Sequence, residues 1–306
     1  MSTSVIVPVY NGAHVLPRTV PSVLAQGGVD EWVWVDDGST DGTAEALGAL
    51  LAAEPRARVV RQPVNRGRAA ARNRGLDATA GDTVVLFDAD VRPPPRAARR
   101  LAEAAWAPGA VAAVGRVRPV LDRPDDPFQT YLAHYRRGPG GGPGPTPWKH
   151  FLTGLCAVRR DALDAAGRFD EAVPYGEDLA LACQLRRSHP DGLAFVDVPF
   201  DLFDLGTLET ALANMRAVGG ALPGLARRCP GVLSLVGMDR AAASPALLRL
   251  ARVPVPPGPA QAVLRALPRA ARVRAVRYLL GHALLSAFAR APRRPPPSDR
   301  VGGGGG

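Results

Sequence analysis

The sequence predicts an α/β fold in which a mainly parallel sheet is flanked by helices. Strand-like and helix-like segments alternate through the first half of the chain, which is typical of a parallel sheet covered on both faces. The run Thr83–Phe87 (TVVLF) is continuously apolar, as expected for a strand that helices cover on both sides. Acidic residues follow several of the strands, at the edge where sheets of this kind bind ligands.

Strands and helices are expected in alternation along the chain. The expected strands are Ser4–Val9, Trp32–Asp36, Arg58–Arg61, Thr83–Phe87, Ala110–Val117, Leu155–Arg159 and Ala194–Val198. The expected helices are Ala13–Gln26, Ala44–Ala53, Arg68–Ala78, Pro94–Trp106, Arg160–Ala166, Gly176–Ser188 and Thr207–Val218. Ser39 or Asp41 is a candidate N-cap of the second helix, because both side chains can accept a hydrogen bond from its first turn.

The chain is expected to divide into three parts. Residues 1–220 form the main domain, residues 221–291 form a helical C-terminal region, and residues 292–306 form a disordered tail that ends in five glycines. The segment Gly138–Pro147 (GPGGGPGPTP) is not expected to hold regular structure. A flexible lid over a site and a plain loop are equal alternatives for it.

The charge of the chain is carried almost entirely by arginine. The net charge is +10, and Lys149 is the single lysine among 38 basic residues. Nucleic acid is not expected as a partner, because the arginines are dispersed and few aromatic residues lie among them to stack bases. A compositional bias is one alternative, and attraction to phosphates of a nucleotide or of a membrane surface is another.

The three cysteines predict neither a disulfide framework nor a structural zinc site, because they are widely spaced and form no CxxC pair. A reducing compartment is therefore expected. The N-terminus shows no signal-type segment, and no run of about 20 apolar residues predicts a membrane span. We expect a cytoplasmic protein, with the inner face of the membrane as an alternative.

Three acidic clusters are the strongest functional signal. Asp36-Asp37 follows one strand, Asp88-Ala89-Asp90 follows the buried run TVVLF, and Glu177-Asp178 precedes an amphipathic helix. Hard cations such as Mg²⁺ or Mn²⁺ prefer carboxylate oxygens and complete their shell with phosphate and water. The alternative for each cluster is a structural role at a helix N-terminus, where the helix dipole favours acidic residues.

Other catalytic patterns are missing. The sequence contains no GxxxxGK[ST], GxGxxG, GxSxG or HExxH, and its five histidines are scattered. Nucleotide hydrolysis at a P-loop, serine-esterase chemistry and zinc hydrolysis are therefore unsupported.

Taken in order, the motifs resemble those of the family 2 glycosyltransferases, which have the GT-A fold. The resembling segments are Ser4–Gln26, Val35–Thr43 (VDDGSTDGT), Asn65–Asp90, Phe151–Glu171 and Gly176–Arg187 (GEDLALACQLRR). Together they span roughly residues 4–190. Several separated motifs in the right order are far more specific than any one of them.

The resemblance implies transfer of a sugar from a nucleotide-diphosphate-sugar, a UDP-sugar by preference, to an acceptor hydroxyl with inversion. Asp178 is implied as the catalytic base, and Asp90 as the ligand of Mg²⁺ or Mn²⁺. The residues implied in nucleotide binding are Pro8, Tyr10, Asp37, Arg72, Asp88 and Ala89, with Asp36 a second candidate for holding the base. Those implied near the donor or acceptor sugar are Thr153, Gly154 and Glu177. The acceptor is expected to be a glycan, a lipid-linked molecule or a small molecule.

The sequence also departs from the family pattern. Many members carry a metal-site histidine where Asp197–Leu205 has none, so Asp201, Asp204 or water is expected to replace it. The QxxRW motif of processive synthases is absent, which favours a non-processive enzyme. A nucleotidyltransferase is an alternative, although Pro8–Gly12 lacks the basic residue that such enzymes carry there. A non-catalytic sugar-nucleotide-binding protein is another, although its acidic clusters would not need to be intact.

The segment Ala271–Ala291 predicts an amphipathic helix, because apolar residues recur at helical spacing among arginines. Such a helix can lie on an anionic membrane surface. Packing of the same apolar face on the main domain is an equal alternative.

Overall fold

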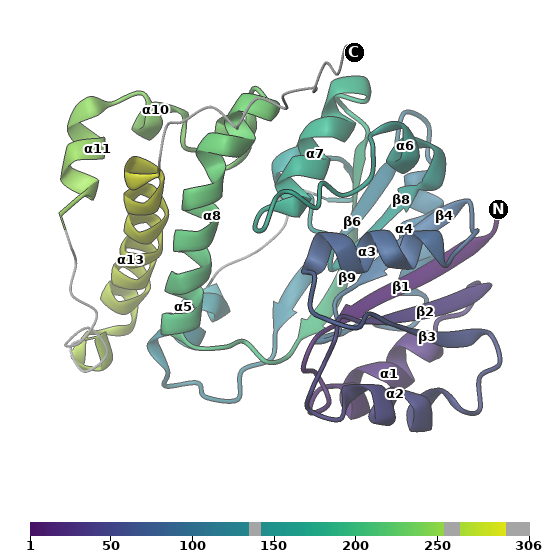
Figure 1. Ribbon diagram of the computed structural model, residues 1–306. Coiled ribbons are helices and arrows are strands. Elements are labelled where there is room, and N and C mark those ends of the chain that lie inside the picture. The colour runs from purple at the N-terminus through teal and green to yellow at the C-terminus, as the bar shows by residue number, and fades with distance from the viewer. Residues whose placement is uncertain (135–141, 254–263, 292–306) are drawn as a thin grey trace, which may run out of the picture.

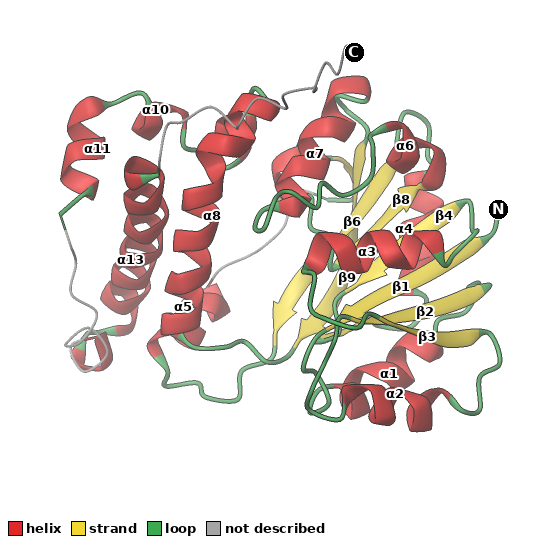
Figure 2. Ribbon diagram, viewed as in Figure 1, coloured by secondary structure: helices red, strands yellow, loops and turns green. Residues whose placement is uncertain are grey.

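The computed structural model describes residues 1–134, 142–253 and 264–291. Figure 1 shows an α/β body built around one sheet and, beside it, a layer of helices that includes α8 and α13. The expected α/β class is confirmed: a mostly parallel sheet carries helices on both sides, and a helical region follows it in the chain (Figure 2).

The sheet has the strand order β3-β2-β1-β4-β8-β6-β9-β5, with β7 paired to β9 off this path. Its strands are β1 (Thr3–Val9), β2 (Glu31–Asp36), β3 (Ala57–Arg61), β4 (Thr83–Phe87), β5 (Val91–Arg92), β6 (Ala112–Pro119), β7 (Gly144–Pro145), β8 (Leu155–Arg159) and β9 (Leu193–Leu202). Strands β1 to β4 run parallel, and β8 is antiparallel to both β4 and β6. The carboxyl ends of β1, β2 and β4 therefore meet at one edge.

The strands form because their residues are apolar and β-branched, and helices cover both faces of the sheet. Ile6 of β1, Val33 of β2 and Val85 of β4 are fully buried. The flanking helices are α1 (Leu16–Leu24), α2 (Thr43–Leu51), α3 (Arg68–Asp77), α4 (Ala97–Ala105), α6 (Arg160–Ala165) and α7 (Glu177–Ser188). Helix α3 packs flush on β1, because a Cβ atom at Gly75 would lie 2.4 Å from Ile6 Cγ2.

The helical layer is built mainly on α8 (Leu208–Arg228) and α13 (Arg269–Arg290), which pack against each other. Its other members are α5 (Pro127–His134), α9 (Val232–Leu235), α10 (Asp239–Ala242) and α11 (Pro245–Ala251). At the α8–α13 contact, a Cβ atom on Gly219 would lie only 2.1 Å from the carbonyl oxygen of Leu284. Among the helices of the described ranges, none combines the length and apolar character needed to cross a bilayer.

Two elements differ from the sequence prediction. Helix α8 continues through Gly219, Gly220 and Pro223 to Arg228, so it runs across the proposed division at residue 220. Within the Gly/Pro-rich segment, residues 144–145 form the short strand β7 beside β9, and Thr146 N donates a 2.8 Å hydrogen bond to Leu193 O. The expectation that the whole of this segment lacks regular structure is wrong for those residues, because β9 offers them a free edge. Its residues 138–141 and the expected disordered tail 292–306 lie outside the described residues.

The expectation of no disulfide is also wrong. Cys183 in α7 and Cys229 at the end of α8 form a disulfide, and the remaining cysteine, Cys156, is buried. The two half-cystines are 46 residues apart, so their spacing carries no signal and only the packing of α8 beside α7 brings them together. The disulfide joins the helix that begins with Glu177-Asp178 to the helical layer.

Candidate active site

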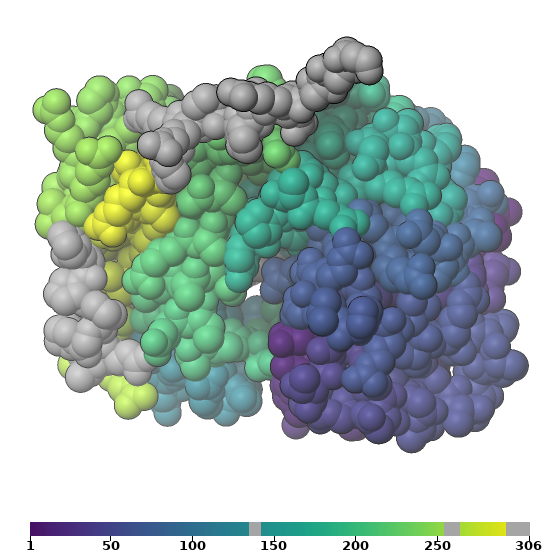
Figure 3. Space-filling model, in the orientation of Figure 1, coloured from purple at the N-terminus to yellow at the C-terminus, as the bar shows by residue number. Residues whose placement is uncertain are grey.

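The acidic clusters of the sequence meet at the carboxyl edge of the sheet. The pairs Asp36-Asp37 and Asp88-Asp90 leave β2 and β4 at that edge, and Glu177-Asp178 begins α7 beside them. The surface is hollowed between this part of the molecule and the helical layer (Figure 3). The first two clusters follow from strand order alone, whereas the third depends on where α7 packs.

Arg72 of α3 ties two of the clusters together. Its side chain is 3% exposed, and its guanidinium donates to Glu177 Oε1 at 2.7 Å and to Asp88 Oδ1 at 3.0 Å. Burial alone would lower the pKa of Arg72, but the charges of Asp88, Glu177 and Asp178 raise it above its ordinary value. Arg72 therefore stays charged and lies beneath the cluster as the link between β4 and α7.

Asp178 has the electrostatic environment of a general base. Burial and the neighbouring charge of Glu177 raise the pKa of Asp178 to about 6, while Arg72 and the Leu179 N–H oppose that rise. Leu179 N donates to Asp178 Oδ1 at 2.8 Å, which orients the carboxylate at the first turn of α7. A carboxylate with a pKa near 6 is ionised at neutral pH and is more basic than an ordinary aspartate, which suits proton abstraction.

Asp88 and Asp90 form a second pair of carboxyl groups. Burial and the charges of Asp88 and Asp204 raise the pKa of Asp90 to about 7, with Arg68 as an opposing cation. The Asp88 side chain is 44% exposed, so it is open to solvent while it pairs with Arg72.

These carboxylates fit a divalent cation whose shell is shared with a ligand. A cation would offset the burial and the repulsion that raise the pKa of Asp90. Mg²⁺ and Mn²⁺ accept one or two carboxylates when phosphate and water complete the shell. Within the described residues, no three or more His, Cys, Asp or Glu side chains are already grouped to hold a metal ion.

The structure separates the two aspartates that could replace the missing histidine. Asp201 is buried and pairs with Arg92 at 2.5 Å and with Arg118, so its charge is already compensated. Asp204 instead contributes to the raised pKa of Asp90 and has positive φ (48°). Its Oδ2 lies 3.2 Å from His14 Nε2, a contact across 190 residues that sequence reasoning had no signal to find.

The carboxylates of Asp36 and Asp37 hold loops in place. Asp37 accepts hydrogen bonds from Gln62 Nε2 (2.7 Å), Arg66 N (2.8 Å) and Gly67 N (2.9 Å), and burial raises its pKa. Asp36 accepts one from Ser39 N at 2.9 Å. These bonds hold the loop that follows β2 and the loop that follows β3. Direct contact of either carboxylate with a nucleotide base stays a prediction.

The other predicted residues lie around the same edge. Tyr10 is half exposed at the end of β1, with Pro8 partly buried below it. Thr153 is buried, and Gly154 touches Asp88: Asp88 N donates to Gly154 O, and a Cβ atom on Gly154 would lie 2.1 Å from Asp88 Oδ2. A glycine is therefore required at 154 for Asp88 to keep its place, and Ala89 lies partly buried beside it.

An apolar groove of about 690 Å³ adjoins the start of α7. It lies between the loop Ala172–Pro174 and the small residues of α8, among them Gly220, Ala221 and Gly224, and Arg227 and Arg228 line it at the end of the same helix. The groove is therefore close in the chain to Glu177-Asp178, on the side of the helical layer.

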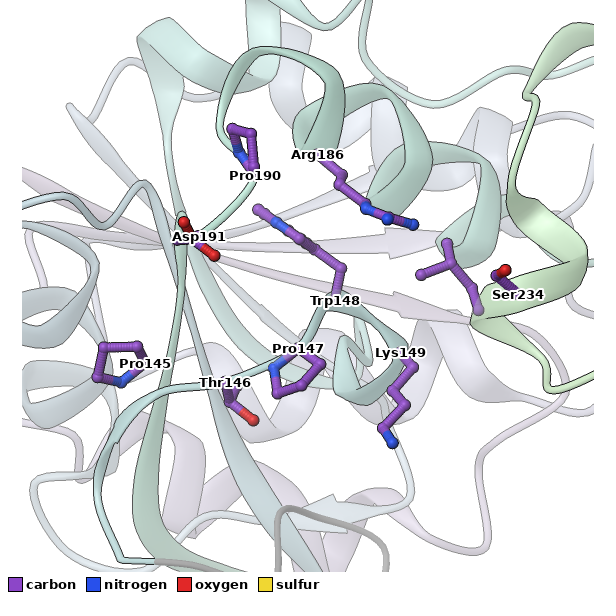
Figure 4. A pocket seen from close by; sticks show the side chains of 10 residues that line it. Pro145, Thr146, Pro147, Trp148, Lys149, Arg186, Pro190, Asp191 and Ser234 are labelled. Atoms are coloured by element: carbon purple, nitrogen blue, oxygen red, sulfur yellow. The ribbon is translucent and has the colours of Figure 1, made fainter.

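A pocket of about 410 Å³ lies toward the other end of α7 (Figure 4). Residues 145–149 and Arg186 line it, and Lys149 is the single lysine of the chain. Arg186 follows Glu177 by nine residues, which is about 13 Å along the helix axis. The pocket is therefore separate from the carboxylate cluster.

Comparison with known proteins agrees with this geometry. The model of the family described as Glycosyl transferase family 2 matches residues 4–167, which is more than half of the chain. The chain is similar to the succinoglycan biosynthesis protein ExoO of Rhizobium meliloti, with 40% identity over 110 residues that cover 36% of this chain and 31% of that protein. It is also similar to the undecaprenyl-phosphate 4-deoxy-4-formamido-L-arabinose transferase of Edwardsiella ictaluri, with 41% identity over 33% of each chain. These matches span about a third of the length of each relative.

Two solved structures share the fold. The mannosyltransferase PcManGT from Pyrobaculum calidifontis, in complex with GDP-Man and Mn²⁺, aligns with a TM-score of 0.64 and 21% identity, over 94% of this chain and 87% of that one. TarS 1-349 of S. aureus in complex with UDP-GlcNAc aligns with a TM-score of 0.55 and 14% identity, over 94% and 90% of the two chains. At this identity the likeness establishes the GT-A type fold.

Proposed function

Because the chain belongs to glycosyl transferase family 2, we propose that it transfers one sugar from a nucleotide-diphosphate-sugar to an acceptor hydroxyl, with inversion at the anomeric carbon. The observation that carries the proposal is Asp178, a carboxylate whose pKa is raised to about 6 at the edge where Asp88 and Asp90 also lie. One base opposite the leaving group is sufficient for a single displacement.

The proposed displacement needs no base other than Asp178. The acceptor oxygen forms a bond to the anomeric carbon, and its proton moves to a carboxylate oxygen of Asp178. The bond from the anomeric carbon to the diphosphate oxygen breaks, and the electron pair leaves with the diphosphate. The carboxylate of Glu177 is already paired with Arg72, which favours Asp178 as the acceptor of that proton.

Asp90, together with Asp88 or Asp204, would hold Mg²⁺ or Mn²⁺. A bound cation neutralises the charge that develops on the departing diphosphate. The Mn²⁺ in PcManGT supports use of a divalent metal. The neighbours were solved with both GDP-Man and UDP-GlcNAc, which supports a nucleotide-sugar donor, and a UDP-sugar is the donor that we propose. Tyr10, Asp37 and the loops that Asp37 holds are the proposed surroundings of the nucleotide.

The acceptor is proposed to enter from the side of the helical layer. The undecaprenyl-phosphate transferase among the relatives favours a lipid-linked acceptor, and the apolar groove between the loop Ala172–Pro174 and α8 is the surface that an apolar acceptor would follow. A glycan or a small molecule is the alternative. A lipid-linked acceptor would hold the reaction at the surface of a membrane. The proposed catalytic part is the α/β body and the proposed acceptor side is the helical layer, since the division predicted at residue 220 falls within α8.

The test is release of nucleotide from a panel of nucleotide sugars, with Mn²⁺ or with a chelator. A glycosyltransferase without acceptor should release nucleoside diphosphate slowly, and only with metal. Release of pyrophosphate from a nucleoside triphosphate would instead support the nucleotidyltransferase. Binding seen as a raised melting temperature, without turnover in any acceptor mixture, would support the non-catalytic alternative.

A further inference from the structure

The net positive charge of this protein arises from its C-terminal region. Residues 221–306 contain 14 arginines and two aspartates, which gives a net charge of +12. The whole chain carries +10, so residues 1–220 carry −2. The α/β body is therefore nearly neutral, whereas the region that includes α11 and α13 is strongly basic.

Most of that charge is not compensated within the described residues. The described part of the region contains eleven arginines, and one of them, Arg228, pairs with a carboxylate, Asp170 Oδ2 at 2.7 Å. Arg252, Arg272 and Arg290 donate to backbone carbonyls, which leaves their charge in place. A surface of this sign, which its own side chains do not neutralise, attracts phosphate-rich partners.

Helix α11 adds an apolar stripe to this basic region. Leu247, Leu250 and Val253 are 44%, 65% and 57% exposed, and their spacing of three residues sets them side by side on the helix and its final turn. Arg249 lies between Leu247 and Leu250 in the chain, and its side chain makes no hydrogen bond or ion pair to any described residue. Exposed leucines of this kind are informative when they cluster, because single ones are common on any surface.

The position of α11 leaves this stripe facing outward. Its opposite side, with Leu248 and Ala251, is buried, and α11 packs on α13. Arg252 donates to Ala289 O at 3.0 Å and so anchors the end of α11 to α13. Figure 1 shows α11 at the outer edge of the helical layer, on the side away from the sheet.

Helix α13, which the sequence made the candidate for a lipid surface, instead packs inside the layer. Val276 and Ala283 are buried, and the helix packs against α8 and α5. The apolar face of α13 is therefore packed against other helices of the protein, which is the alternative to a membrane contact that the sequence left open. Among the described residues of the C-terminal region, the large exposed apolar side chains lie mainly on α11 and the turn that follows it.

We propose that the outer face of α11 docks on an anionic membrane, with Leu247, Leu250 and Val253 among the upper acyl chains and Arg249 at the lipid phosphates. Apolar insertion and attraction of arginines to anionic lipid are the two terms that bind an interfacial helix, and this face supplies both. A nucleic acid would be attracted by the positive charge, but it would not bury the apolar stripe. A second copy of this chain would bring an equally basic region against it.

The experiment is flotation of the full chain with vesicles of phosphatidylcholine, with and without phosphatidylglycerol. The protein should float with the anionic vesicles at low salt, bind them less at high salt, and stay behind with neutral ones. The double variant L247E/L250E should bind anionic vesicles at least about tenfold more weakly, because it removes the insertion and adds repulsion.

Two matched variants sharpen the test. Arg249→Glu should weaken binding by about tenfold, whereas Arg74→Glu, the same charge change on an exposed arginine of α3, should change it by less than about twofold. Tyr278→Glu places a charge on the exposed side of α13 and should bind nearly as wild type does. Circular dichroism and nucleotide release from the donor should be unchanged in all of them, which separates this proposal from the proposed catalytic function.

The proposal is overturned if wild-type protein fails to float with anionic vesicles at low salt, or if L247E/L250E floats as wild type does. An equal loss in Arg74→Glu and Arg249→Glu would replace the α11 face by diffuse attraction. A loss in Tyr278→Glu alone would return the membrane contact to α13. Binding of duplex DNA that competes with the vesicles and does not depend on Leu247 and Leu250 would make the region a general polyanion binder.

Discussion

Gly154→Ala tests whether the site depends on the close contact between Gly154 and Asp88. The added Cβ atom would lie 2.1 Å from Asp88 Oδ2 and 2.5 Å from its Cγ, whereas ordinary contact begins at 3.4 Å. Asp88 must therefore shift by about 1.3 Å. The 3.0 Å ion pair between Asp88 and Arg72 does not survive a shift of that size.

Gly154→Ala should lower both the stability of the fold and the affinity for UDP. Arg72 is buried and keeps its pair with Glu177, while Asp88 is partly exposed and can turn to solvent, so the free energy of unfolding should fall by only about 1–2 kcal/mol. Displacement of Asp88 also removes the contact that it is proposed to make with the bound metal, and one hydrogen bond to a charged group is worth about 1.5–3 kcal/mol. Affinity for UDP with Mn²⁺ should therefore fall by roughly ten- to a hundredfold.

Calorimetry of UDP binding with Mn²⁺ and thermal unfolding measure the two effects. Gly48→Ala is the matched control, because Gly48 lies in α2 with nothing within 4 Å of an added Cβ, and alanine there should stabilise by about 0.5–1 kcal/mol. If Gly154→Ala binds UDP and Mn²⁺ as tightly as wild type, Asp88 has no part in donor binding.

The remaining predictions concern the base, the metal and the helical layer. Asp178→Asn should lower turnover by about two to four orders of magnitude with donor affinity nearly unchanged, and a larger loss in Glu177→Gln would move the base to Glu177. Because the base acts when deprotonated and the pKa of Asp178 is about 6, wild-type kcat/KM should rise with pH through about 6, a limb that steady-state kinetics should find missing in Asp178→Asn. Asp90→Ala should abolish the Mn²⁺-dependent part of UDP binding in calorimetry, and unchanged binding would remove Asp90 from the metal site. Gly219→Ala should lower the melting temperature, because its Cβ would lie 2.1 Å from Leu284 O; a melting temperature equal to wild type would contradict the tight α8–α13 contact.

Local pattern was sufficient for the central strands and for the acidic clusters. The predicted strands Thr83–Phe87 and Leu155–Arg159 have the bounds of β4 and β8, because a buried strand is a short apolar run with clear polar limits. The order of the strands then brings the carboxylates after β2 and β4 to one edge. No rule about nearest neighbours in sequence predicts that Arg72 joins Asp88 to Glu177 across 105 residues.

Tertiary contacts overrode local preference in the helical layer. A glycine pair and a proline favour a helix end, which is why α8 was predicted to stop at Val218. The helix continues because Gly219 has no side chain to hold α13 away, and burial of the contact outweighs the propensity. The disulfide of Cys183 and Cys229 and the contact of His14 with Asp204 depend on the same long-range packing.

The sequence by itself determined that this chain is an α/β glycosyltransferase with carboxylates at one sheet edge, because hydrophobic pattern and ordered motifs act over short distances along the chain. The tertiary structure alone decided how those carboxylates are tuned. The pKa of Asp178 and of Asp90 depends on burial and on charges from distant segments, and Arg72 stays charged because two acidic clusters surround it. Electrostatic energy depends on separation in space and on exclusion of water, and neither is written in the order of residues.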